Sequence, residues 1–180
     1  MSQSNELEVL GDSVEAADAR ETKHKSEFSA LFMSALRAAD AVVAGARLAG
    51  EYVTLDPKIA TINGVEKNTV LSQLQFARML DFQTAQTEGE VRQQVLDRLN
   101  YVCDLLACLA EYYQNNEQYQ HAEKAWHHCL NIHAVYSGIE SQEALYAAEH
   151  LRRALIAQGK KREAAMLTIL MTGKAGKYVQ

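Results

Sequence analysis

The sequence predicts an all-α protein built from antiparallel helical hairpins, and two observations carry that prediction. The chain of 180 residues is rich in alanine and has a single proline, Pro57, and these two residue types are the best and the worst helix formers. Apolar residues also recur at the 3.6-residue helical period in segments joined by short links. Short links between helices force antiparallel neighbours, so the segments are expected to pack as hairpins.

The first segment, residues 1–25, is predicted to be a disordered acidic tail. Its few apolar residues cannot offset the entropy lost on ordering it. It serves either as a solubilising tail or as a segment that folds on a partner. Its charged residues are Glu6, Glu8, Asp12, Glu15, Asp18 and Glu21 against Arg20, Lys23 and Lys25.

Residues 26–90 are expected to supply N-terminal helices that complete the helical stack. A first helix over 26–52 is predicted to start at a Ser26 cap, and its small residues AADAVVAGARLAG permit close approach of another backbone. Pro57 and the Asn63-Gly64 turn signal mark residues 53–66 as a connection. A second helix is predicted over 68–84, and the polar run TAQTEGE over 84–90 breaks it.

Four further helices are predicted in residues 91–172, and residues 173–180 are expected to form a flexible C-terminal tail. The long helix has apolar residues at helical spacing from Val91 to Tyr113. The predicted helices cover residues 91–115, 119–136, 141–158 and 160–172.

Two segments of this region agree when the chain is shifted on itself by forty-two residues. They are LAEYYQNNEQYQHAEKAWHHCL, residues 109–130, and LRRALIAQGKKREAAMLTILMT, residues 151–172. Ala122 falls on Ala164, and Glu117 falls on Gly159 at the turn. Glycine suits a helix end where φ turns positive. One such hairpin cannot bury its own apolar face, so each is expected to stack on a neighbour.

The first copy resembles a tetratricopeptide repeat, and the spacing is similar to that of the longer repeats of kinesin light chains. The resemblance implies a short right-handed solenoid with extra N-terminal helices. The residues that meet the repeat-core pattern are Leu109, Ala110, Tyr113, Tyr119, Ala122, Trp126 and Cys129 in the first copy and Leu151, Leu155, Gly159 and Ala164 in the second. The second copy departs from the pattern at Arg152, Lys161 and Thr168, as expected of a terminal repeat whose outer face meets water.

In this family the first helices of successive repeats line a concave groove that binds other proteins. The predicted partner-binding residues are Asp104, Glu111, Asn115, Tyr146, Glu149, His150 and Arg153. Because Asp104, Glu111 and Glu149 are acidic, the groove is expected to take a peptide or partner helix with basic character. Alternatively, these residues are simply solvated helix faces.

The predicted function is therefore that of a non-catalytic adaptor or scaffold for protein–protein interaction. Two alternatives stay open: a small chaperone for a secretion-system or assembly subunit, and a structural subunit of a larger complex. Formation of a homo-oligomer is also compatible with the sequence. No catalytic residues and no cofactor are predicted, since the chain has neither a nucleophile elbow nor a glycine-rich phosphate loop.

The net charge and the cysteines narrow the expected partners and the expected cellular location. The net charge of -5 disfavours a nucleic-acid partner, and no apolar run is long enough for membrane insertion. Three cysteines in a leaderless chain favour reduced thiols and a cytoplasmic protein. Cys129 and His133 lie four residues apart, a spacing that can chelate a metal. Since Cys129 occupies a packing position of the repeat, core packing is favoured and no metal site is predicted.

Overall fold

The computed structural model describes residue 30 and residues 33–79 and 87–172. The predictions for the tail over 1–25, the Ser26 cap and the tail over 173–180 lie outside the described residues. The helix predicted over 68–84 was too long, because the observed helix ends at Ala77, and only residues 80–84 of that range lie outside the described residues.

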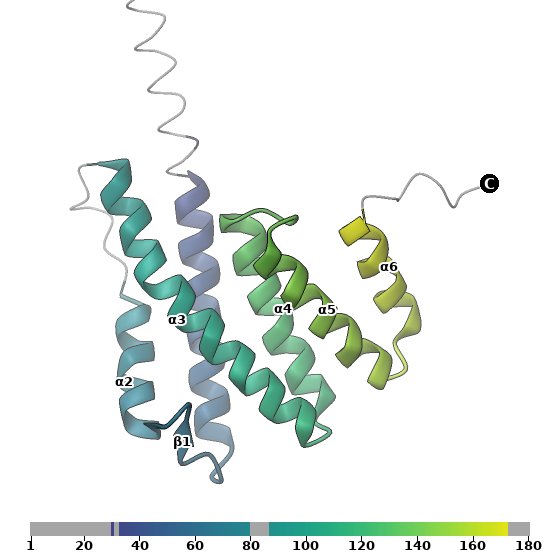
Figure 1. The fold of residues 1–180 in the computed structure, drawn as a ribbon. Coiled ribbons are helices and arrows are strands. Elements are labelled where there is room, and N and C mark those ends of the chain that lie inside the picture. The colour runs from purple at the N-terminus through teal and green to yellow at the C-terminus, as the bar shows by residue number, and fades with distance from the viewer. Residues whose placement is uncertain (1–29, 31–32, 80–86, 173–180) are drawn as a thin grey trace, which may run out of the picture.

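The described chain is mostly helical, which confirms the all-α prediction, with one very short β-hairpin added (Figure 1). A first helix covers residues 33–55. The elements after it are β1 (Thr61–Ile62), β2 (Val65–Glu66), α2 (Lys67–Ala77), α3 (Glu88–Asn115), α4 (Tyr119–Tyr136), α5 (Gln142–Ala157) and α6 (Lys161–Thr172).

The last four helices pack in chain order, α3 on α4, α4 on α5 and α5 on α6 (Figure 1). Side-chain caps fix where two of them begin. The Thr87 hydroxyl accepts a hydrogen bond from the backbone N–H of Glu90, whose carboxylate accepts one from the backbone N–H of Thr87, a capping box. Ser141 caps α5 in the same way through the N–H of Ala144, at 3.2 Å. The predicted starts of these two helices, residues 91 and 141, lie within three residues of the observed starts, Glu88 and Gln142.

The turns of the hairpins α3–α4 and α5–α6 have the same geometry at positions forty-two residues apart. Glu117 and Gly159 both have positive φ, at 60° and 77°. The next residue closes each turn: the N–H of Gln118 donates to the Tyr113 carbonyl at 2.8 Å, and that of Lys160 to the Leu155 carbonyl at 2.9 Å. The repeat seen in the sequence is thus a repeat of backbone conformation at the turn.

A short hairpin fills the connection that the sequence marked only as a turn. Thr61 pairs with Glu66 and Ile62 with Val65. Asn63 and Gly64 have φ values of 51° and 76°, as a two-residue turn that follows the twist of its strands requires. The hairpin leads directly into α2, so the chain reverses between helix 33–55 and α2 (Figure 1).

Helix 33–55 packs closely on the first repeat hairpin. A Cβ atom added to Gly45 would lie 3.0 Å from Leu106, 3.1 Å from Val102 and 3.1 Å from Ile132. These side chains belong to α3 and α4, so the small residue lets three helices meet. Near the end of the helix, Tyr52 donates from its hydroxyl to the His121 carbonyl at 3.2 Å.

The hydrophobic core is continuous through helix 33–55 and α2 to α6. Most side chains of the repeat-core pattern are buried in it. The buried members are Leu109, Ala110, Tyr113, Ala122, Trp126, Cys129, Leu151, Leu155 and Ala164. Tyr119 is only partly buried, and Gly159 is an exposed turn residue.

Helix α6, the last described element, is less polar on its exposed side than the sequence suggested. Lys161 and Thr168 are exposed, as expected of a terminal repeat. However, Met166 and Leu170 are also 64% and 68% exposed.

Among the helices that the structure describes, none has both the length and the apolar character to cross a membrane.

Candidate functional site

A cavity of about 340 Å³ lies between α3 and α5, with α4 beneath it. We call it the α3–α5 groove. Asn100, Cys103, Asp104 and Ala107 of α3 form one wall, and Gln142, Glu143, Tyr146 and Ala147 of α5 form the other. Trp126, Cys129 and His133 of α4 complete the lining. Two of the predicted partner-binding residues, Asp104 and Tyr146, therefore line a real depression.

Three rings stack where α4 meets α5. The His150 ring centroid lies 4.5 Å from that of Trp126 and 4.5 Å from that of Tyr146. Trp126 is only 1% exposed, whereas Tyr146 is 53% exposed. Burial, and then the nearby Arg153, lower the pKa of His150. This shift favours the neutral form of the ring, which acts as an aromatic surface.

Carboxylates stand on both walls of the groove. Asp104, Glu111 and Glu143 are exposed, and none forms an ion pair with another of the described residues. The Tyr146 hydroxyl donates to Glu111 at 3.5 Å, which joins α5 to α3 across α4. The lining contains no lysine or arginine, and its one basic group is His133, so acidic groups outnumber basic ones in the cavity.

Glu149 and Arg153, two other predicted partner-binding residues, are engaged with each other. Glu149 accepts from Arg152 at 2.7 Å and from Arg153 at 3.0 Å. The hydrogen bond from Arg152, helped by that from Arg153, holds the pKa of Glu149 at about 2. Asn115 is exposed at the last residue of α3 and does not line the cavity. Of the predicted partner-binding residues, Glu111 and Arg153 thus lie near His150, and Asn115 lies apart from the cavity.

The cavity lining also includes residues that the sequence did not assign to the groove: Asn100, Cys103, Gln142, Glu143, Ala147 and, from α4, His133. Trp126 Nε1 and His133 Nδ1 are buried and have no hydrogen-bond partner among the described residues. Buried donors or acceptors without partners cost about 1–3 kcal/mol each. Both atoms belong to residues of the groove.

Cys129 and His133 both interact with Cys103 at the base of the groove. The Cys129 thiol lies 3.5 Å from the Cys103 carbonyl oxygen. A hydrogen bond from the Cys129 thiol, and then the His133 imidazole, lower the pKa of Cys103 against the opposing effect of burial. The same hydrogen bond and burial raise the pKa of Cys129. The pair therefore loses its first proton from Cys103.

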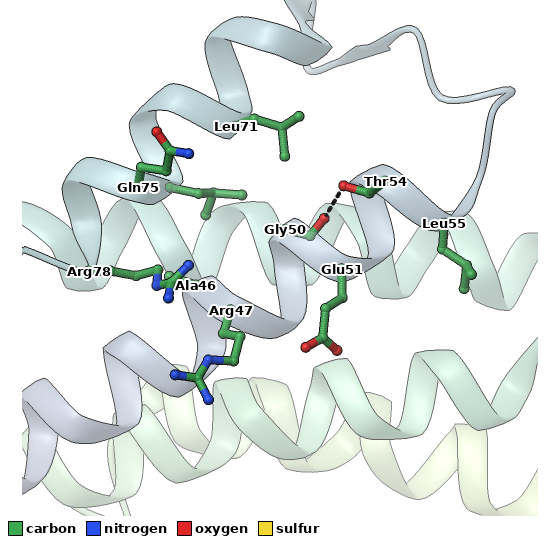
Figure 2. Close-up of a pocket in the computed structure, with 10 residues that line it drawn as sticks. Ala46, Arg47, Gly50, Glu51, Thr54, Leu55, Leu71, Gln75 and Arg78 are labelled. Atoms are coloured by element: carbon green, nitrogen blue, oxygen red, sulfur yellow. Dashed lines mark hydrogen bonds between the residues drawn. The ribbon is translucent and has the colours of Figure 1, made fainter.

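A second and larger cavity, of about 660 Å³, lies between helix 33–55 and α2 (Figure 2). Leu71 points from α2 toward helix 33–55, and Arg78 extends from the end of α2 toward Ala46. Arg47 and Glu51 point away from α2. Its lining mixes aliphatic residues with charges of both signs, and it lacks the ring cluster and the concentration of like charge found in the α3–α5 groove. Residues 80–86, which follow α2 in the chain, lie outside the described residues.

Within the described residues, no group of three histidine, cysteine or acidic side chains is arranged to hold a metal ion. Comparison of the chain with protein-family models, with curated proteins and with solved structures gives no match.

Proposed function

We propose that the protein is a non-catalytic interaction module that binds a peptide or partner helix in the α3–α5 groove. The bound segment carries an apolar or aromatic side chain next to a lysine or arginine. The observation that carries the proposal is the groove itself, in which the exposed ring of Tyr146 shares one cavity with Asp104 and Glu143, whose carboxylates form no ion pair with a described residue.

The aromatic side of the groove supports an apolar anchor. Tyr146 offers an exposed ring held by His150, and Trp126 and Ala147 provide buried apolar surface beside it. Aromatic residues in preformed pockets supply most of the binding energy in many interfaces. Because the ring is already stacked, little side-chain freedom is lost on binding.

The acidic walls support a basic neighbour for that anchor. Asp104 and Glu143 face the cavity from opposite helices, and Glu111 lies next to Tyr146. A lysine or arginine entering the groove would meet these carboxylates without displacing an existing ion pair. Complementary charge of this kind raises the rate of association and selects the partner.

We interpret the fold that accompanies this function as a tetratricopeptide-like stack of two unequal repeats. It is supported by the matching turns at Glu117 and Gly159 and by the burial of Ala122 and Ala164 at the start of each second helix. In such a stack α3 and α5 are the first helices, and the groove lies between them. Its rigid walls are suited to an adaptor or scaffold.

A peptide-display selection on the purified full-length chain tests the proposal. We expect selected peptides to share a basic residue close to an aromatic or large aliphatic one. Binding of a labelled selected peptide, followed by fluorescence anisotropy, should weaken about thirtyfold in Tyr146→Ala, as for a hot spot of about 2 kcal/mol. Glu111→Arg should weaken it about tenfold and reduce its salt dependence.

Two further variants make the charge argument specific. Arg153→Glu should tighten binding, since it removes a positive charge at the edge of the groove. Glu66→Arg makes the same charge change at an exposed residue of β2, which neither lines the cavity nor contacts Tyr146 as Glu111 does, and should leave affinity within about twofold. Equal weakening by Glu111→Arg and Glu66→Arg, or selection of acidic peptides, would contradict the proposed site.

A further inference from the structure

We propose that Cys103 and Cys129 form a peroxide-responsive thiol pair, in which Cys103 is oxidised first and Cys129 closes a disulfide with it. The two thiols and the His133 imidazole lie together at the base of a cavity open to solvent. The inference does not depend on what the groove binds.

The pair is created by the packing of α3 on α4. Cys103 and Cys129 are twenty-six residues apart on these two antiparallel helices, and the Cys129 thiol reaches the Cys103 backbone at 3.5 Å. Each of the two thiols also shifts the pKa of the other, and both residues line the same cavity. The two side chains therefore already lie together across the α3–α4 contact before any oxidation.

The surroundings favour a thiolate on Cys103. His133, one helical turn after Cys129, lies against Cys103, which raises the pKa of the imidazole. Asp104 on α3 and Glu143 on α5 also face this cluster, and both stabilise the imidazolium while Asp104 opposes the thiolate. A thiolate beside an imidazolium is the reactive form of cysteine.

Size selects the oxidant that can reach the pair. Cys103 and Cys129 are only 4% and 2% exposed, yet both line the cavity. Hydrogen peroxide is little larger than a water molecule and can reach sulfurs that are this deeply buried, whereas a bulky disulfide would have to bring its own sulfur in line with a buried one. We therefore assign a hydroperoxide, the smallest being hydrogen peroxide, as the co-reactant.

The chemistry balances with that oxidant alone. The Cys103 thiolate attacks one peroxide oxygen, the S–O bond forms and the O–O bond breaks. The departing hydroxide takes a proton from the His133 imidazolium and leaves as water. Cys129 then attacks the sulfenic sulfur, the S–S bond forms, the S–O bond breaks, and the hydroxide released takes the Cys129 thiol proton. Two thiols and one peroxide thus give one disulfide and two waters.

The experiment treats the reduced full-length chain with hydrogen peroxide and reads intact mass and non-reduced tryptic peptides. We expect a loss of two hydrogen atoms that dithiothreitol reverses. Cleavage after lysine and arginine places Cys103 in the peptide 99–124 and Cys129 in the peptide 125–152. Because Cys108 shares the first peptide, the same mapping in Cys108→Ser assigns the bridge to Cys103.

Variants distinguish the role of Cys103, which is oxidised first, from that of Cys129, which closes the disulfide. Cys129→Ser should stop disulfide formation and leave a sulfenic acid on Cys103 that dimedone traps. Its rate of formation should hold near neutral pH and fall as the pH is lowered and the thiolate is protonated. His133→Asn should slow oxidation about tenfold by removing the cationic partner, while His127→Asn, at an exposed position outside the cavity lining, should not.

Three results would overturn the inference. They are a disulfide that persists in Cys103→Ser, a bridge that disappears in Cys108→Ser, and a product in the wild-type chain that contains only over-oxidised or intermolecularly linked cysteine. A circular dichroism spectrum matching the wild type in each variant ensures that a negative result reports on the thiols and not on loss of fold.

Discussion

Glu117 and Gly159 occupy the same turn position in the two hairpins but differ in how well they suit it. Both residues have positive φ, a region that costs a residue with a Cβ atom about 1 kcal/mol or more and costs glycine nothing. The first hairpin therefore carries local strain that the second has relieved. The sequence alignment of the two copies placed these residues opposite each other, so this detail could be predicted from the repeat.

The strain at Glu117 leads to a stability prediction. Glu117→Gly should raise the free energy of unfolding by about 0.5–1 kcal/mol, since relief of the positive φ exceeds the added entropy of the unfolded chain. Gly159→Ala should lower it by about the same amount. Urea denaturation followed by circular dichroism measures both. A destabilised Glu117→Gly variant would show that its side chain stabilises the turn in some other way.

Other features at the residue scale differ in whether a single sequence predicts them. The burial of Trp126 and Leu151 follows from their helical spacing. The meeting of Cys103 with Cys129 depends on the register between two helices, which periodicity along either helix does not reveal. The pairing of Glu149 with Arg152 and Arg153 is different, because it lies within α5 at i,i+3 and i,i+4 spacings. The sequence shows these spacings, so the expectation that Glu149 is available to a partner overlooked a visible signal.

At the scale of elements, helix 33–55 is attached to the repeat hairpin through its small residues. Gly45 lies against Leu106, Val102 and Ile132, whereas the nearest contact of a Cβ atom at Gly50 would be Leu74 at 3.9 Å. Two glycines of one helix therefore have opposite environments. One permits close packing, and the other lies where an extra methyl group fits.

This contrast predicts opposite effects of substitution. Gly45→Leu should lower the free energy of unfolding by about 1–3 kcal/mol, because overpacking between the three helices outweighs the better helix propensity of leucine. Gly50→Ala should raise it by about 0.5–1 kcal/mol through propensity alone. Urea denaturation midpoints, compared at a common dependence of the free energy of unfolding on urea concentration, measure both changes. If both variants were stabilised, helix 33–55 would not pack on α3 and α4 as described.

The limits of helices were predictable where turn or cap residues lie close to them, and the short hairpin was not. Residues 119–136 were predicted and found as a helix, because the links on both sides are short and polar. Each strand of the β-hairpin has only two residues, too few to show the alternation of a half-buried strand. Only the Asn63-Gly64 turn was visible in the sequence.

For the whole molecule, the sequence led to a face of the repeat hairpins, and the structure shows a cavity on that face. Asp104, Glu111 and Tyr146 were selected by family resemblance, and the structure brings Tyr146 to both the cavity and Glu111. Glu143 of α5 and His133 of α4 join the lining because α5 packs on α4. A functional surface made by three helices needs their relative positions, which a single sequence does not contain.

The measurement that tests the central claim most directly uses Trp126, the only tryptophan of the chain, which lies in the α3–α5 groove. In a ¹⁵N-labelled sample its indole N–H gives a single resonance. Titration with a display-selected peptide should shift that resonance with the same dissociation constant as anisotropy gives, and Tyr146→Ala should weaken both together. Saturation of the protein with an unmoved indole resonance, and shifts confined to helix 33–55 and α2, would contradict the account.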